Sequence, residues 1–222
     1  MVDGAAGCET AVAELLPLCL GASYLSGCSV TTKRSLPPSE VQFLRVGDHF
    51  PRERSVGFAE PVVSTAAEFE AALRTFVASY ATAGKTEKIR LIVHHWLDGL
   101  ACWALEDLYL SATTVLQIIA ATEKKKAPIR KPSFYKYVVA AGARYGVPTL
   151  SHDFKDMRND LIHDGTLSGS RFSGKTLIEC SIVAAEVLNW IDHYIHAAMG
   201  LGPVLRARLG APTVARLNAY SL

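Results

Sequence analysis

Apolar residues from residue 64 onward recur at intervals of three, four or seven, the period of one buried helix face. The longest stripe runs from Ile89 to Ile119 and predicts one helix over 86–122, with a bend at Gly99. The last stripe predicts a helix over 175–199, where apolar residues extend around more than half of the circumference. We therefore expect both helices to be buried, at the centre of a helical fold or at an interface.

Three shorter helices carry local start and stop signals. Ser64 or Thr65 can cap the first helix, which Gly84 ends, and Ser133 can cap the second. Gly165 ends the third. The predicted ranges are 65–84, 133–145 and 151–163. Mostly short connections between the helices predict an all-α fold, an up-and-down helical bundle.

The first 63 residues have a different pattern. A short apolar helix is expected over 10–22, interrupted by Pro17. Short strands are expected over 29–33 and 41–46, around the turn at 36–39. We interpret residues 1–63 as a small mixed α/β appendage and residues 64–222 as the helical bundle.

The chain is unusually apolar for a soluble protein. It has 222 residues, of which 50% are hydrophobic, and its mean hydropathy is +0.19. Such a composition excludes an intrinsically disordered chain. No stretch of about 20 residues is free of charges and helix breakers, and the N-terminus lacks the basic region of a signal peptide. We expect a cytoplasmic protein without membrane contact, whose surplus apolar surface is buried in a homodimer.

The cysteines and the other metal-ligating residue types form no recognisable set. The cysteines are odd in number, scattered and without a C-x-x-C pair, which indicates reduced thiols. They are Cys8, Cys19, Cys28, Cys102 and Cys180. No cluster of His, Cys, Asp or Glu has the spacing of metal ligands. We expect neither a metal nor a cofactor.

One segment matches the phosphate-binding loop pattern G-x-x-x-x-G-K-[ST]. Residues 169–176 fit this pattern in full, and a predicted helix follows Lys175. However, a helix and not a strand precedes Gly169, and the residues after Thr176 are too few for a parallel sheet. We interpret the segment as a Gly/Ser loop that caps the last helix. Nucleotide binding, and contact of the loop with a nucleic-acid phosphate, remain alternatives.

A second segment carries residue types that suit RNA cleavage. A histidine can move a proton near neutral pH, and an arginine can bind a phosphate through its planar fork. Arg158 and His163 lie near the end of a predicted helix, and Asn159 lies one turn before His163, on the same side. Arg90 and His95 have the same spacing, but they lie within an apolar helix and we interpret them as structural.

The segment from Met157 to Gly165 resembles the R-[polar]-x-x-x-H signature of HEPN domains, the higher-eukaryote and prokaryote nucleotide-binding helical bundles. The order of helices over residues 65–200 resembles that family too. The resemblance implies a metal-independent endoribonuclease in which two protomers form one composite cleft. It further implies that Arg158 binds the scissile phosphate, that His163 acts on the 2′-hydroxyl or the leaving oxygen, and that Asn159 positions His163. The implied product ends in a 2′,3′-cyclic phosphate.

The expected partners follow from this interpretation. They are single-stranded RNA, a second copy of the chain, and an antitoxin or a regulatory protein, since the enzyme would act as a toxin or an antiviral-defence effector. The candidate RNA-binding residues are Lys124, Lys125, Lys126, Lys155 and Lys175. A non-catalytic HEPN-like module that binds RNA or protein is the main alternative function, and a nucleotide-binding protein that uses residues 169–176 is the second.

Overall fold

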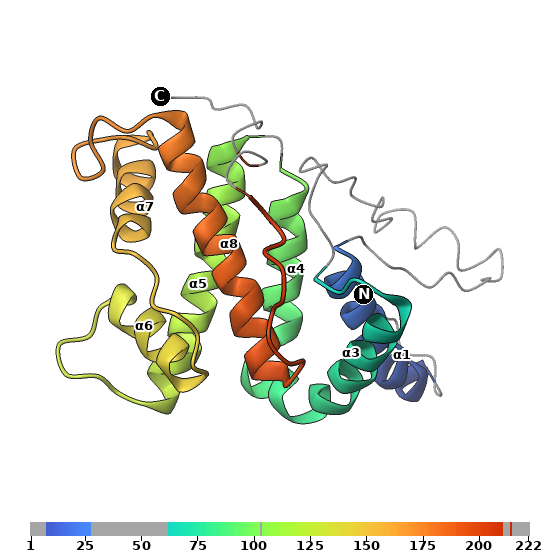
Figure 1. Ribbon diagram of the computed structural model, residues 1–222. Helices are drawn as coiled ribbons and strands as arrows, with labels where there is room; N and C mark the ends of the chain where they lie inside the picture. The colour runs from blue at the N-terminus through green and yellow to red at the C-terminus, as the bar shows by residue number, and fades with distance from the viewer. Residues whose placement is uncertain (1–7, 28–61, 103, 211–213, 215–222) are drawn as a thin grey trace, which may run out of the picture.

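The computed structural model describes residues 8–27, 62–102, 104–210 and 214, and this part of the chain is helical without a β-strand. Figure 1 shows the helices as one packed bundle. Their bounds are α1 Cys8–Ser26, α3 Ala66–Ser79, the π-helical turn η1 Tyr80–Gly84, α4 Ile89–Leu100, α5 Leu105–Lys126, α6 Phe134–Arg144, α7 Asp153–Asp164 and α8 Leu177–Met199. The predicted all-α fold is therefore confirmed for the described residues. None of the helices described is long and apolar enough to cross a membrane.

The single helix predicted over 86–122 is wrong, because the chain folds back between α4 and α5. Gly99 packs against the side chain of Ser111, and the Ser111 hydroxyl donates a hydrogen bond to the carbonyl of His95 at 2.8 Å. A Cβ at Gly99 would lie 3.3 Å from the Ser111 Cβ, so glycine allows the two helices to approach closely. The apolar stripe continues across the break because both helices bury the same face.

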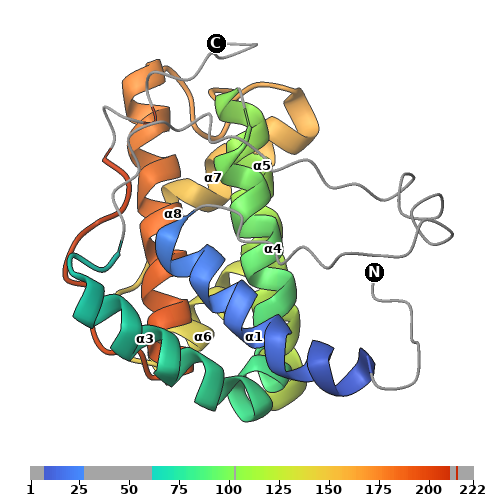
Figure 2. The ribbon, with the colours of Figure 1, turned by 90° about the vertical axis from the view of Figure 1, so that its right-hand side faces the viewer.

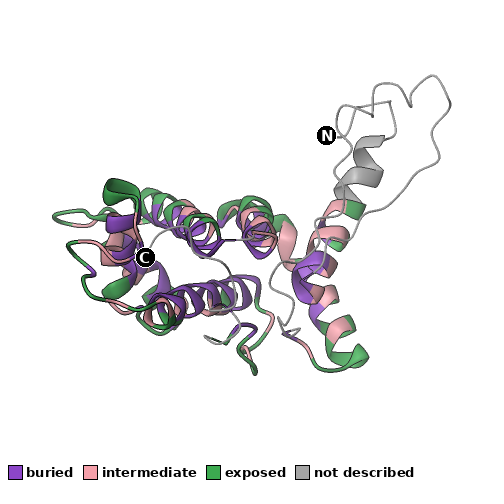
Figure 3. Cartoon of the chain, turned by 90° about the horizontal axis from the view of Figure 1, so that it is seen from above, coloured by how far each residue is buried: buried purple, intermediate pink, exposed green. Residues whose placement is uncertain are grey.

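Helices α5 and α8 form the centre of the bundle. They run side by side in the same direction, with α4 in the opposite direction (Figure 1). The up-and-down alternation that we expected is not kept at α6. After α5 ends, the loop 127–133 runs back toward α7, so that α6 does not begin at the end of α5 (Figure 1). Figure 3 shows the buried residues on the inward faces of the helices. The central position of α8, expected from its apolar circumference, is confirmed by fifteen buried residues.

Helix α1 packs beside α3 and against α4 (Figure 2). The predicted interruption at Pro17 is wrong, since α1 continues through Pro17 to Ser26. The C-terminal part of α1 is held by burial, because Tyr24 and Leu25 have no exposed surface. The strands predicted over 29–33 and 41–46 lie outside the described residues, and the division at residue 64 stays a prediction.

The predicted helix caps explain where the shorter helices begin. The Thr65 hydroxyl accepts a hydrogen bond from the N–H of Glu68, whose carboxylate binds the N–H of Thr65 in return. The Ser133 hydroxyl caps α6 in the same way, through the N–H of Lys136. Each such cap satisfies N–H groups that the first turn of a helix leaves without a partner.

The segment after α8 lies along the bundle and is fixed by a buried ion pair. Arg208 is 1% exposed, and its Nε donates to Oδ2 of Asp192 at 3.1 Å. The Tyr24 hydroxyl donates to the other Asp192 oxygen at 2.9 Å. The guanidinium also lies 4.4 Å from the ring centre of Trp96. Asp192 therefore joins α1, α8 and the C-terminal segment.

Candidate functional site

Helix α7 carries the Arg158–His163 motif on the outer part of the bundle, beside the first turns of α8 (Figure 1). Its buried residues are Phe154, Met157, Asp160 and Leu161, which form one inward face. Gly165 ends the helix in the left-handed region, with φ of 70°. The predicted helix and its stop signal are confirmed, and the motif occupies its last two turns.

Arg158 is a half-buried cation without a counterion. Its guanidinium lies 5.0 Å from the ring centre of Phe134, and one of its terminal nitrogens donates to Oδ1 of Asn159 at 3.2 Å. Burial lowers the pKa of Arg158, yet an arginine remains charged at neutral pH. Within the described residues it forms no ion pair, and its buried Nε has no hydrogen-bond partner.

Other arginines of the described chain differ from Arg158. The buried Arg208 pairs with Asp192, and even the exposed Arg144 and Arg171 pair with the buried carboxylates of Glu123 and Asp160. An arginine that is partly removed from water without a carboxylate loses hydration and gains no ion pair. Such an arrangement is typical of a residue that awaits an anionic ligand.

Asn159 and His163 lie on α7 as the spacing predicts, but no hydrogen bond joins them. Asn159 accepts from Arg158 instead, and His163 is exposed, without a hydrogen-bond partner among the described residues. Five helical positions separate Arg158 from His163, which rotates the two side chains by about 140° around the axis. Within one chain, Arg158 therefore turns toward α6 while His163 turns outward.

Asp160, within the same motif, binds the loop that follows α7. Its carboxylate is fully buried and accepts backbone hydrogen bonds from Gly169 at 3.0 Å, Arg171 at 3.1 Å and Phe172 at 2.7 Å. These hydrogen bonds and the Arg171 guanidinium hold the pKa of Asp160 below its usual value despite burial. A Cβ at Gly169 would lie 2.8 Å from Asp160 Cγ, so only glycine fits there.

Lys175 and Thr176 of the phosphate-loop pattern are also occupied. The N–H of Lys175 donates to the Ser168 hydroxyl at 2.9 Å, and the N–H of Thr176 donates to Glu179 at 2.9 Å. The Lys175 ammonium and the Thr176 hydroxyl both contact the Glu179 carboxylate. Helix α7, and not a strand, precedes the loop. The N–H groups that would hold a phosphate in a nucleotide-binding loop bind the protein's own side chains, which favours the loop interpretation.

The candidate RNA-binding lysines are not gathered at one place. Lys124, Lys125 and Lys126 end α5, at the end of the bundle opposite to the C-terminal end of α7 (Figure 1). Lys126 contacts the buried Glu87. Lys155 lies on α7, 4.0 Å from Asp156, and Lys175 pairs with Glu179 at 3.2 Å. Only Lys155 and Lys175 are on or next to the motif helix.

A group of aromatic residues beside Arg158 was not found from the sequence. Phe134 and Tyr135 are half-buried in the first turn of α6, and both rings lie within 6 Å of the buried Phe154 ring, at 5.9 and 5.8 Å. Their position in the first turn, directly after the Ser133 cap, is the signal that could have indicated partial exposure.

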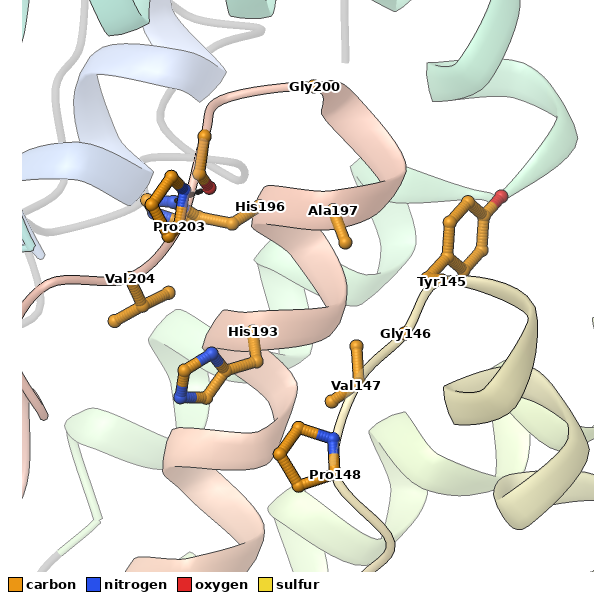
Figure 4. A pocket seen from close by; sticks show the side chains of 11 residues that line it. Tyr145, Gly146, Val147, Pro148, His193, His196, Ala197, Gly200, Pro203 and Val204 are labelled. Carbon is orange, nitrogen blue, oxygen red and sulfur yellow. Dashed lines mark hydrogen bonds between the residues drawn. The ribbon is translucent and has the colours of Figure 1, made fainter.

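A cavity lies elsewhere, between α8, the link after α6 and the segment after α8 (Figure 4). Its volume is about 500 Å³, and its lining includes Tyr145, His193 and His196. Nδ1 of His196 lies 3.2 Å from the carbonyl oxygen of Gly202, and burial lowers the pKa of His196. Arg158, Asn159 and His163 do not line this cavity.

The comparisons with known proteins and the metal-ligating residues of the described chain bear on what this site is. Comparisons with protein-family models, with curated proteins and with solved structures give no match. In the described part of the chain, no group of three or more His, Cys, Asp or Glu residues could hold a metal ion. The resemblance to HEPN domains therefore depends on the motif on α7 and on the order of the helices.

Proposed function

We propose that the protein is a metal-independent endoribonuclease of the HEPN type, which cleaves single-stranded RNA through Arg158 and His163. The observation that carries the proposal is the half-buried Arg158 guanidinium, which has no carboxylate partner within the described residues. A phosphodiester supplies the missing negative charge and accepts the planar fork of an arginine. The exposed His163 on the same helix supplies a group that can move a proton.

The chemistry of the proposed reaction needs no group beyond these side chains. The ribose 2′-oxygen attacks the phosphorus and loses its proton, the bond from phosphorus to the 5′-oxygen breaks, and that oxygen gains a proton. One product ends in a 2′,3′-cyclic phosphate and the other begins with a 5′-hydroxyl. His163 takes or returns the proton, and Arg158 binds the charge on the phosphoryl oxygens.

A pair of chains fits this proposal better than one chain. Because Arg158 and His163 diverge around α7, one phosphate meets both more easily if the histidine comes from a second copy. An apolar surface lies near the motif: Ile162 is 45% exposed on α7, and Ile178 and Ile182 are 64% and 50% exposed on α8. These isoleucines are candidates for the homodimer contact that we expected from the composition.

The chemical groups at the ends of the RNA fragments test this function. Wild-type protein incubated with single-stranded RNA in EDTA is expected to release fragments that end in a 2′,3′-cyclic phosphate. An RNA that lacks the 2′-hydroxyl throughout should remain intact, because it has no internal nucleophile. Fragments with 3′-hydroxyl ends, or cleavage of the RNA only when a divalent metal is added, would contradict the proposal.

A non-catalytic RNA-binding module is the second candidate, favoured by one observation. His163 has no side chain to orient it within the described residues, and Asn159 is engaged by Arg158. This candidate predicts retention of RNA without cleavage. It also predicts an affinity that falls with salt and weakens when Lys124, Lys125 and Lys126 are neutralised.

A further inference from the structure

The aromatic residues next to Arg158 form a platform with features of a nucleobase-binding subsite. We define the platform by Phe134, Tyr135 and His152. Tyr135 stacks on the buried Phe154 at 5.8 Å between ring centres, and His152 lies 4.7 Å from Tyr135. The His152 side chain is 52% exposed, and Phe134 and Tyr135 are half-buried. The base of the platform is therefore packed on the core, and its outer edge is exposed at His152.

Cations lie close to the platform residues along the chain, and one of them, Arg158, contacts Phe134. Lys131 and Lys136 flank the two aromatic residues in sequence, and the Lys136 ammonium donates to the Lys131 carbonyl at 3.0 Å. Lys131 is one of two non-glycine residues described with a positive φ, at 55°, so the loop is held in an uncommon conformation directly before α6. Lys155 and Arg158 follow on α7. The nearby carboxylates are Asp153, which is exposed, Asp156, which pairs with His152 at 3.2 Å, and Glu186, which accepts hydrogen bonds from Ser151.

Aromatic rings interleaved with cations are the elements that bind single-stranded nucleic acid. Bases stack on the rings, and the cations follow the sugar–phosphate backbone. Eleven helical positions separate His152 from His163, a rise of about 16 Å along α7. Arg158 follows the platform along α7 and contacts Phe134, so one strand can meet the platform and then the arginine, while the histidine comes from a second copy.

We propose that the Phe134–Tyr135–His152 platform takes an unpaired nucleobase of the same RNA whose phosphate Arg158 binds. The inference builds on the proposed function, because it assigns a substrate class, unstacked single-stranded RNA, to the same site. A base inside a duplex cannot reach the platform, since both of its faces are covered by neighbouring bases.

The test uses the full chain with His163→Ala in EDTA, so that binding is measured without cleavage. The two probes are a short oligouridylate RNA and an oligomer of equal length in which every base is removed, which keeps the phosphate charge. The expected result is tighter binding of the oligouridylate, by about tenfold. Equal affinity for the two oligomers, or no binding of either, would overturn the proposal.

Substitutions then assign the base preference to the platform. Tyr135→Ala is expected to abolish the preference and Tyr135→Phe to keep it, because only the ring is needed. Tyr80→Ala is the matched control, since Tyr80 is also half-buried and stacks on a buried phenylalanine, Phe76, at 6.3 Å. Lys136→Gln should weaken both oligomers equally. A preference that survives Tyr135→Ala, or that Tyr80→Ala also abolishes, would contradict the assignment.

Failure of this inference and failure of the proposed function are distinguishable. If the wild-type protein cuts no RNA but the base preference depends on Tyr135, the subsite stands and the nuclease does not. If RNA is cut while both oligomers bind equally, the nuclease stands and the subsite does not. Should Tyr135→Ala fail to fold, His152→Ala, which removes the exposed ring of the platform, replaces it and should reduce the same preference.

Discussion

The guanidinium of Arg158 lies 5.0 Å from the ring centre of Phe134, and no carboxylate in the described part of the chain balances its charge. Arginine stacks on an aromatic face through its planar group, and this contact offsets part of the lost hydration. The remaining cost is borne by the free protein, and under the proposed function an RNA phosphate offsets it. On that proposal, Arg158 is kept for function at the expense of stability.

Replacing Arg158 with methionine is accordingly expected to leave the free energy of unfolding unchanged or to raise it by up to about 1 kcal/mol, while RNA cleavage is lost. Methionine keeps the apolar contact with Phe134 and removes the uncompensated charge. Chemical denaturation measures the change. Arg208→Met is the matched control, because it leaves Asp192 buried without its cation and should cost about 3–5 kcal/mol. A loss of similar size for both variants would contradict this account of Arg158.

Asp160→Asn tests the clasp between α7 and the loop at 169–172. At neutral pH we expect the free energy of unfolding to fall by about 3 kcal/mol, because several charge-assisted hydrogen bonds weaken together. The native pKa of Asp160 is below the ordinary value, so the unfolded chain takes up the proton first as the pH falls. The difference in the free energy of unfolding between the wild type and Asp160→Asn should therefore be complete above about pH 5 and shrink below about pH 4. Urea denaturation of both proteins across this pH range measures the difference. A difference that stays constant down to low pH would contradict the role of Asp160 in holding the loop.

The loop at 169–176 should bind no nucleotide, although it matches the phosphate-loop pattern. Asp160, Ser168 and Glu179 already accept hydrogen bonds from its N–H groups. We expect calorimetric titration with ATP or GTP, in the presence of magnesium, to give no heat of binding for the wild type or for Lys175→Ala. Micromolar binding that disappears in Lys175→Ala would restore the nucleotide-binding alternative.

Ile178→Glu is expected to weaken self-association, because it places a charge on the exposed isoleucine surface next to the motif. Sedimentation velocity should show a dimer for the wild type and a monomer for the variant, with RNA cleavage lost in parallel. Leu205→Glu is a control, since Leu205 is 75% exposed and lies outside the helices. A wild type that sediments as a monomer while it cleaves RNA would remove the composite site.

Local signals explain how much of the fold could be predicted. Thr65, Ser133 and Gly165 act on the backbone within one turn, so the sequence shows where their helices begin or end. The turn between α4 and α5 leaves a weaker signal: Gly99 indicates a bend near it, but residues 101–104 contain neither glycine nor proline that would end the helix. The contact of Gly99 with Ser111, which fixes that turn, is tertiary.

The candidate site was predictable only in part. The spacing of Arg158, Asn159 and His163 places them on one helix, but it does not show that Asn159 binds Arg158 or that Asp160 is occupied by a loop. Those contacts depend on where the chain returns after Gly165. The platform could not be predicted for the same reason. Tyr135 lies on α6 and His152 caps α7, so the two side chains meet only in the folded protein.

The rate of RNA cleavage in EDTA, measured with protein in excess over a single-stranded substrate, tests the central claim most directly. We expect wild-type cleavage to fall by about 100-fold or more in both Arg158→Ala and His163→Ala. The matched variants Arg90→Ala and His95→Ala, which have the same spacing on α4, should cleave like the wild type. Equal rates for the wild type, Arg158→Ala and His163→Ala would contradict the assignment of this site.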